Sequence, residues 1–394
     1  MAGKITYIYE TPIKNKKVLL RVDFNVSLNP DHTIANDARI KQSIPTINYL
    51  LKNNNRLIIV SHLGRPKNHD INFSLLPVAN DLQSYLPNYK VILVNDFTSQ
   101  DGKKIISEQK ENEIILLENI RFYPGEEQND PVFTQTLANL GEVYVNDAFG
   151  VCNRVHSSIV GITKYLPSYA GLLLEKEIEI ISKAIANPQK PFIAIIGGAK
   201  ISDKMNLLWR LTEIADHLLI GGGLANTFLA AQGFKVGKSL YDSGELDKVR
   251  QLFFFAAEKN TVIQLPLDVV VGTVDGSTSE VKKVADVSPE LQILDIGPET
   301  LIKFRSLIAS AKTIVWNGPV GYFENPLFRK GTDSVYNAIV ENSTGTSIVG
   351  GGDTLNAISQ EEFLNKITHI STGGGAMLEF IEKGTLPGID ALKK

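Results

Sequence analysis

Apolar runs and helical patterns alternate along the whole chain. The apolar runs are continuous stretches of Val, Ile and Leu, as in strands covered on both faces of a parallel sheet. They predict strands at 18–26, 56–62, 90–95, 114–118 and 143–147 in the first half, and at 192–197, 217–221, 262–271, 313–316, 347–350 and 368–371 in the second. This repetition of strand and helix predicts doubly wound α/β sheets.

A helical segment separates the two halves. Residues 172–186, LLLEKEIEIISKAIA, have apolar residues at helical spacing, a charged opposite face, and prolines just beyond. A chain of 394 residues is too long for one ordinary core. We therefore expect α/β architecture with two doubly wound parallel-sheet (Rossmann-like) domains, a connecting hinge helix, and an active-site cleft between the domains.

Polar or glycine-rich clusters follow the predicted strands at their carboxyl ends, where open α/β sheets bind ligands. The first half has RVDFN, SHLGR, ENIRF and NRVH, and the second has GGAK, IGGG, NGP, GGGD and TGGG. Arginine forks grip phosphates and carboxylates, and backbone N–H groups bared by glycine cradle phosphates. The sequence therefore predicts two anion sites of different chemistry, and hence transfer between two phosphorylated molecules.

Arginines gather at the strand ends of the first half. A single arginine is more often part of a surface salt bridge than of a binding site. Grouped beside other polar side chains, they predict a pocket for a small polyanion. The residues are Arg21, Asp23, Asn25, Arg39, His62, Arg65, Arg121 and Arg154, with His156 ranked below His62.

Two lysines and an aspartate are the candidates in the second half. Lys200 and Lys204 follow two glycines, and a helix opening there would place both on one face near an anion-favouring N-terminus. The alternative is two solvated lysines. Asp353 follows three glycines and could hold Mg²⁺ or cap a helix beginning near Leu355.

Two further features have open interpretations. Glu324 could accept ribose hydroxyls or be a surface charge, and Gly373, Gly374 and Gly375 indicate either close approach of a ligand or segment, or a flexible turn. GFKVGKS at 233–239 lacks the spacing of a Walker A loop, and no dinucleotide-binding glycine fingerprint follows a predicted strand. The sequence gives no catalytic triad and no Cys/His metal spacing.

The bulk composition excludes some partners. A net charge of −3 and a pI near 6.1 give no reason to expect nucleic acid or membrane binding. Cys152 is the single cysteine, so no internal disulfide is expected, and the N-terminal residues lack the apolar core of a signal peptide. We expect a cytoplasmic protein.

The motifs together resemble those of the phosphoglycerate kinase family from end to end. RVDFNV (21–26), SHLGRP (61–66), LLENIRFYPGEE (116–127), NDAFG (146–150), GGAKISDK (197–204), GGGLANTFL (221–229), VWNGPVGYFE (315–324), GGGDT (350–354) and STGGGA (371–376) stand in that family's order and spacing. Each motif alone has modest specificity for the family, whereas the whole set is highly specific.

The resemblance implies a reversible, Mg²⁺-dependent transfer of the acyl phosphate of 1,3-bisphosphoglycerate to ADP, giving 3-phosphoglycerate and ATP in glycolysis. It implies hinge closure, direct in-line transfer and a monomer. The implied domains are 1–171 with about 380–394 for 3-phosphoglycerate, a hinge at 172–187, and 188–379 for the nucleotide.

The resemblance also assigns residues to roles. The implied substrate-binding set is Asp23, Asn25, Arg39, His62, Leu63, Gly64, Arg65, Arg121 and Arg154. The implied nucleotide-binding set is Gly198, Ala199, Lys200, Lys204, Glu324, Gly351, Gly352, Asp353 and Thr354, with Asp353 also the metal ligand. The implied catalytic set is Arg39, Lys200, Gly373, Gly374 and Gly375.

Three positions depart from the family pattern. Ser27 stands where proline is common, Asn153 replaces an expected histidine, and Ile293 replaces a frequent glycine. Two alternatives are weighed against the enzyme: a nucleotide-regulated scaffold that has lost turnover, and an NAD-dependent oxidoreductase. The intact Arg39, Lys200, Lys204 and Asp353 argue against the first, and the missing glycine fingerprint argues against the second.

Overall fold

The computed structural model describes residues 3–358 and 361–394 and divides into two compact units. The first unit comprises the chain through Glu179 together with Thr385–Lys394, and the second comprises Ile180–Gly384. The boundary falls inside helix α6 (Leu172–Ala186), the segment predicted to connect the domains. No helix in the described ranges combines the length and the apolar character needed to cross a membrane.

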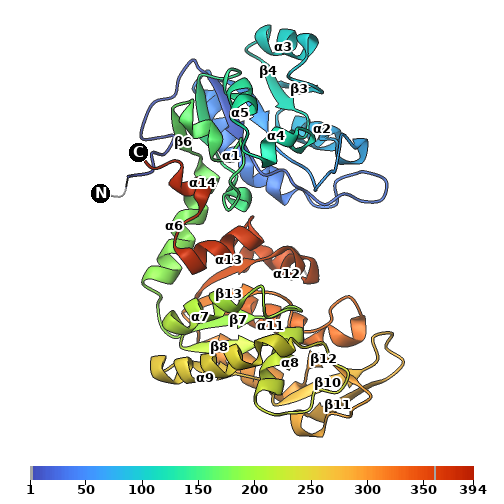
Figure 1. Ribbon diagram of the computed structural model, residues 1–394. Helices are drawn as coiled ribbons and strands as arrows, with labels where there is room; N and C mark the ends of the chain where they lie inside the picture. The colour runs from blue at the N-terminus through green and yellow to red at the C-terminus, as the bar shows by residue number, and fades with distance from the viewer. Residues whose placement is uncertain (1–2, 359–360) are drawn as a thin grey trace. The chain divides into compact units, whose positions relative to one another are not determined.

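The first unit is built on a six-stranded parallel sheet in the order β3-β4-β2-β1-β5-β6 (Figure 1). Neighbouring residues of β1, such as Leu19 and Leu20, are both fully buried, so both faces of the sheet are covered. The strands are β1 (Lys17–Arg21), β2 (Arg56–Val60), β3 (Lys90–Val94), β4 (Glu113–Leu117), β5 (Val143–Asn146) and β6 (Ser168–Ala170). The helices are α1 (Ala38–Lys52), α2 (Leu76–Tyr85), α3 (Gln100–Ser107), α4 (Pro124–Glu127), α5 (Pro131–Ala138) and α14 (Pro387–Asp390).

The C-terminal segment belongs to the first unit. The backbone N–H of Lys4 donates to the carbonyl of Lys394 at 3.2 Å, and that of Gly388 donates to the carbonyl of Cys152 at 2.7 Å. Leu386, Ile389 and Leu392 are buried. The last ten residues are therefore an integral part of this core.

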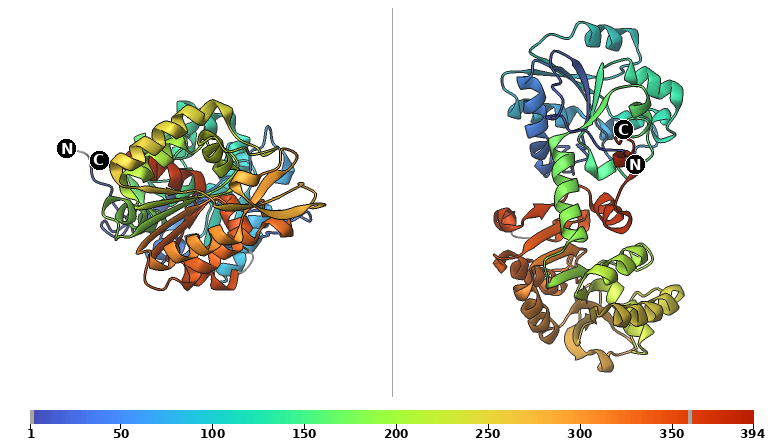
Figure 2. Two further views of the ribbon diagram at one scale, coloured as in Figure 1. Left: turned by 90° about the horizontal axis from the view of Figure 1, so that it is seen from below. Right: turned by 90° about the vertical axis from the view of Figure 1, so that its left-hand side faces the viewer.

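The second unit has its own six-stranded parallel sheet in the order β15-β14-β13-β7-β8-β9. Helices α8 and α9 lie on one side of this sheet and α10 and α11 on the other (Figure 2). The strands are β7 (Phe192–Ile196), β8 (His217–Ile220), β9 (Val262–Gln264), β13 (Thr313–Asn317), β14 (Thr346–Gly350) and β15 (His369–Ile370). The helices are α7 (Met205–Ile214), α8 (Gly222–Ala231), α9 (Leu246–Lys259), α10 (Pro298–Ser310), α11 (Lys330–Glu341), α12 (Gly352–Ala357) and α13 (Gly374–Lys383).

The single strand predicted at 262–271 is wrong. The structure breaks it into β9, at the edge of the parallel sheet, and β10 (Asp268–Gly272), in a separate antiparallel sheet of order β11-β10-β12. Pro266 lies between them and has no N–H to continue a ladder. The other two strands of the small sheet, β11 (Ser279–Lys283) and β12 (Gln292–Ile296), were not predicted.

Each parallel sheet has a point at which the strand order reverses. In the first unit this point lies between β1 and β5, and in the second between β7 and β13. Ligands of open α/β sheets bind beyond the carboxyl ends of the strands at such points. The segments after these strands are the polar and glycine-rich clusters singled out in the sequence.

Candidate functional site

In the first unit, Asp23 lies between two cationic or titratable partners. Its buried carboxylate forms an ion pair with Arg39, which lies in the first turn of α1, and Asp23 Oδ1 is 3.7 Å from Nδ1 of His62. Burial lowers the pKa of His62 well below its usual range, assisted by Arg21, Arg121 and Arg39 and opposed by Asp23. His62 is therefore neutral at pH 7.

Asn25 and Arg121 hold the backbone of Gly64 from its two sides. The backbone N–H of Gly64 donates to Asn25 Oδ1 at 2.7 Å, and Arg121 donates to the carbonyl of Gly64 at 2.6 Å. Gly64 has φ +60°, in the left-handed region that favours glycine. Leu63 is buried, and its carbonyl accepts from the Asn119 side chain at 2.7 Å. This loop is therefore fixed by side chains from β1's end and from the segment after β4.

Arg65 and Arg154 differ from the other predicted arginines because both are exposed. Arg154 lies close enough to His156 to contribute to lowering that imidazole's pKa to about 4, although burial is the largest cause. Arg39 and Arg121 therefore lie near His62, and Arg121 and Arg154 lie near His156. Arg65 and Arg154 are thus cations that solvent or a ligand can reach, whereas Asp23 and His62 are buried polar groups.

Arg21 does not fit the prediction of a pocket-lining arginine. Its side chain is 1% exposed and donates to Ser158 Oγ at 2.9 Å and to the carbonyl of Val22. Ser158 in turn donates to the buried carboxylate of Glu126. Sequence reasoning missed Glu126 and Ser158, because nothing in their local pattern brings segments 32 residues apart together.

In the second unit, the glycine-rich loops after β7 and β13 lie side by side. The backbone N–H of Gly197 donates to the carbonyl of Asn317 at 2.9 Å, and that of Gly198 donates to the carbonyl of Pro319 at 2.9 Å. Gly198 and Gly318 have φ values of +103° and +89°, which side-chain-bearing residues rarely adopt. Glycine is required here for the loops to approach each other.

Lys204 lies against these loops, and Lys200 does not. Lys204 Nζ donates to the carbonyl of Gly197 at 2.6 Å, and burial lowers its pKa to about 8, against the effect of Asp353 and Asp203. Lys200 and Ala199 are exposed. The prediction that both lysines project from one helical face is wrong, because residues 201–204 form a turn and α7 begins only at Met205.

Asp353 lies in the first turn of α12 and is exposed. The interpretation of Asp353 as a helix cap is wrong, because Gly351 occupies that position and no side chain caps the helix. Thr354 is buried and holds two loops, accepting from the backbone N–H of Gly318 at 2.7 Å and donating to the carbonyl of Gly350 at 3.0 Å. Asp353 and Glu324 are both exposed, so solvent or a ligand can reach their carboxylates.

The three glycines at 373–375 lie in different surroundings. Gly373 is the cap residue of α13, and Gly374 packs so closely on the loop after β14 that a Cβ there would lie 2.6 Å from Gly351 Cα. A Cβ on Gly375 would meet no atom within 4 Å. Close approach of another segment therefore accounts for Gly374, and the space beside Gly375 is open.

The departures from the family pattern also have defined places. The side chain of Ile293 packs against the buried cluster of Val269, Val271 and Val287 in the small sheet. Asn153 is half-buried in the loop before Arg154, and the carbonyl of Ser27 accepts from the backbone N–H of Ala35 at 2.9 Å.

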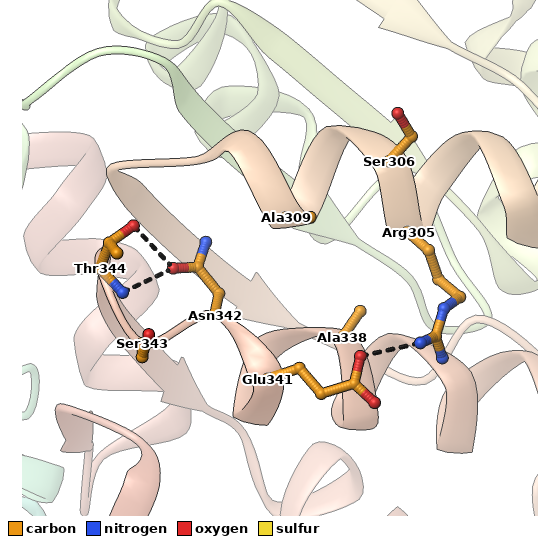
Figure 3. Close-up of a pocket in the computed structure, with 8 residues that line it drawn as sticks. All are labelled: Arg305, Ser306, Ala309, Ala338, Glu341, Asn342, Ser343 and Thr344. Carbon is orange, nitrogen blue, oxygen red and sulfur yellow. Dashed lines mark hydrogen bonds and ion pairs between the residues drawn. The ribbon is translucent and has the colours of Figure 1, made fainter.

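A cavity of about 370 Å³ lies away from these loops, between α10 and α11 (Figure 3). Arg305 bridges its wall by an ion pair to Glu341 at 2.8 Å, and Asn342 accepts from the backbone N–H of Thr344 at 3.1 Å (Figure 3). None of the predicted site residues lines this cavity. It is therefore separate from the candidate site.

Fold and site together define a doubly wound α/β protein whose two sheets each present groups suited to anions at their carboxyl ends. Comparison with known proteins identifies the family within this class. The family model described as phosphoglycerate kinase matches residues 8–384. The chain therefore belongs to the phosphoglycerate kinase family.

Individual relatives agree along the full length. The chain is 46% identical to phosphoglycerate kinase of Dictyoglomus turgidum over 396 residues, covering 100% of both chains. It is 46% identical to that of Moorella thermoacetica, covering 99% of both. The solved phosphoglycerate kinase of Coxiella burnetii has 39% identity and a TM-score of 0.86, with 99% of each chain covered. That of Pyrococcus horikoshii OT3 has 33% identity, a TM-score of 0.86 and 98% coverage of each chain.

Proposed function

We propose that the chain catalyses the reaction for which its family is named, the reversible transfer of the acyl phosphate of 1,3-bisphosphoglycerate to ADP, giving 3-phosphoglycerate and ATP. The observation that supports it most is the presence of an arginine-rich cluster at one sheet's reversal point and a glycine-lysine cluster at the other's. Together with family membership, this pair of clusters accounts for two phosphorylated ligands in one protein.

In this proposal the first unit binds 3-phosphoglycerate. Arg39, Arg65, Arg121 and Arg154 neutralise its phosphate and carboxylate, since guanidinium groups bind both in a bidentate manner. Asp23 and Asn25 accept from its hydroxyl or orient the cations. His62, Leu63 and Gly64 form the rest of the proposed site.

In the same proposal the second unit binds the nucleotide. Gly198, Ala199, Lys200 and Lys204 lie along its phosphates. Glu324 accepts from the ribose hydroxyls. The loop of Gly351, Gly352, Asp353 and Thr354 follows the phosphate chain.

The residues present fit Mg²⁺ delivered with the nucleotide. Mg²⁺ in nucleotide sites is held by one or two carboxylates together with phosphate oxygens and water. Within the described ranges, no group of three or more His, Cys, Asp or Glu side chains is placed to hold a metal unaided. Asp353, exposed beside the phosphate-binding loops, is the carboxylate we assign to it. When bound, the ion would neutralise phosphate charge.

Phosphoryl transfer requires alignment and charge neutralisation more than covalent help from the protein. We assign Arg39, Lys200 and the amides of Gly373, Gly374 and Gly375 to the phosphoryl group in transit. Because the two ligands are assigned to different units, direct in-line transfer requires a ternary complex in which those units approach, with α6 as the hinge. A cytoplasmic monomer without membrane or nucleic-acid partners completes the proposal.

A coupled assay with 3-phosphoglycerate and Mg·ATP tests the proposal. We expect ATP consumption that depends on both substrates. Absence of turnover at saturating Mg·ATP would instead favour the scaffold, and tight NADH binding would favour the oxidoreductase.

A further inference from the structure

Arg21 is a fully buried cation at the end of β1, and its hydrogen bonds fix its orientation. It donates from Nε to Ser158 Oγ at 2.9 Å and from its NH1 nitrogen to the carbonyl of Val22. Its NH2 nitrogen lies 3.4 Å from His62 Nδ1. A buried guanidinium requires compensation for its charge.

Glu126 in α4 supplies that compensation through Ser158. The Glu126 side chain is 0% exposed, and its two oxygens accept from Ser158 Oγ at 2.6 Å and from the Ser158 backbone N–H at 2.9 Å. Burial raises the pKa of Glu126, while Arg21, Ser158 and Arg121 favour its ionised form. Thus Arg21, Ser158 and Glu126 form one buried relay.

The same glutamate fixes the loop that carries Arg154 and His156. The backbone N–H of Ser157 donates to the carbonyl of Glu126 at 2.9 Å, and the Ser157 hydroxyl donates to the carbonyl of Gly125 at 2.8 Å. His156 Nδ1 lies 3.7 Å from Glu126 Oε1. The glutamate is therefore the point at which three segments meet: that of Arg121, that of Arg154, and the end of β1.

The contact between Arg21 and His62 determines the tautomer of the histidine. A guanidinium can only donate, so Nδ1 of His62 must accept, and the ring hydrogen lies on Nε2. The competing partner of Nδ1 is Asp23 Oδ1 at 3.7 Å, beyond hydrogen-bond distance, and Asp23 is already paired with Arg39. Nε2–H is then the donor that His62 offers to a bound anion.

We propose that Glu126 is a positioning residue for the 3-phosphoglycerate site: acting through Ser158 and Arg21, it keeps His62 in the Nε2–H tautomer and holds the Arg154 loop in place. The inference rests on the proposed function for the identity of the ligand. The tautomer of His62 is independent of the proposed function, because contacts within the protein determine it.

Glu126→Gln is the decisive variant, because it keeps the shape and removes the charge. Its carboxamide has one acceptor oxygen for the two Ser158 donors, so the Ser158 hydroxyl loses its acceptor and Arg21 loses the negative charge that compensates it. We expect Ser158 and then Arg21 to shift, which frees Nδ1 of His62 to donate toward Asp23. We expect the KM for 3-phosphoglycerate to rise about tenfold or more, as for loss of a hydrogen bond to a charged group, with the KM for ATP unchanged within about twofold.

Nitrogen-15 NMR of histidine-labelled protein measures the tautomer directly. The chain has six histidines, so the His62 signals are assigned by their loss in His62→Gln. We expect the Nε2–H form in the unmodified protein, and a shift toward Nδ1–H in Glu126→Gln and in Ser158→Ala, the second variant that tests the relay if the first does not fold.

Asp130→Ala is the matched control. Asp130 caps α5, directly after the segment of Glu126, by accepting from the backbone N–H of Phe133 at 2.7 Å. The control loses stability without altering the tautomer or the KM for 3-phosphoglycerate. An Nδ1–H tautomer in the unmodified protein, or no change in tautomer in both relay variants, would overturn the inference. Absence of turnover with the expected tautomers would overturn the proposed function and leave the relay standing.

Discussion

Lys204 is the residue at which stability and proposed function oppose each other. Its side chain is half-buried against the loops after β7 and β13, and its pKa falls from 10.5 to about 8, mainly because of burial. Replacing it with methionine keeps a similar volume and removes the charge. We therefore expect Lys204→Met to stabilise the ligand-free protein while impairing its use of ATP.

The size of the effect follows from the pKa. A fall from 10.5 to about 8 costs on the order of 3 kcal/mol of folding free energy at pH 7. Loss of the hydrogen bond to the Gly197 carbonyl, donated by a charged group, offsets about 2 kcal/mol. The free energy of unfolding of Lys204→Met should therefore exceed that of the unmodified protein by about 1 to 2 kcal/mol at pH 7.

The pH dependence has a defined sign. Between about pH 8 and 10.5 the unfolded chain binds a proton at this lysine that the folded protein does not, so stability from this group rises with pH. The advantage of Lys204→Met should accordingly shrink by pH 9.5. Urea denaturation of both proteins at pH 7 and pH 9.5, without nucleotide, measures it.

The exposed Lys200 in the same loop supplies a control for charge alone. Lys200→Met should leave the free energy of unfolding within about 0.5 kcal/mol, as is usual at exposed positions. If Lys204→Met is less stable at pH 7 than the unmodified protein, and the difference does not change with pH, the account of a buried, charge-strained lysine is refuted.

Two further predictions concern other residues. Arg39→Ala should lower kcat about 100-fold or more, because it removes a hydrogen-bond donor to the transition state. The Kd for ATP, measured by calorimetry, should change less than about threefold. A loss of ATP affinity comparable to the loss of kcat would contradict the role of Arg39. Burial raises the pKa of Asp147 from 3.8 to about 6, where it accepts from the backbone N–H groups of Leu173 and Leu174 at the start of α6. The folded protein therefore binds the extra proton between those values, and stability from this group falls as pH rises from about 4 to 6. Asp147→Asn should gain stability relative to the unmodified protein over that interval in urea denaturation, and a constant difference would contradict the assignment.

Much of the fold could be predicted because buried parallel strands leave a strong pattern. The central strands β1, β2, β7 and β13 are continuous apolar runs, and each begins within one residue of its predicted start. The carboxyl-end clusters follow from the same pattern. The small antiparallel sheet could not be predicted this way, because β11 (SEVKK) is largely exposed and polar.

The candidate site was only partly predictable for a different reason. Sequence spacing indicates which side chains lie near a strand or helix end, and it placed Arg39 correctly at the start of a helix. It extended the first strand to residue 26, whereas β1 ends at Arg21 and Asp23 lies beyond it. It does not show how far a loop runs before its helix starts, so Lys200 and Lys204 were put on one face. Nor does it show burial: Arg21 resembles the other arginines in sequence, and only tertiary packing covers it with Ser158 and Glu126.

A structure of the protein bound to 3-phosphoglycerate and Mg·ADP together tests the central claim most directly. The account predicts 3-phosphoglycerate beside Arg39, His62 and Arg121, and the nucleotide phosphates beside Lys204 and Asp353. Both ligands bound among the residues of one unit would contradict it.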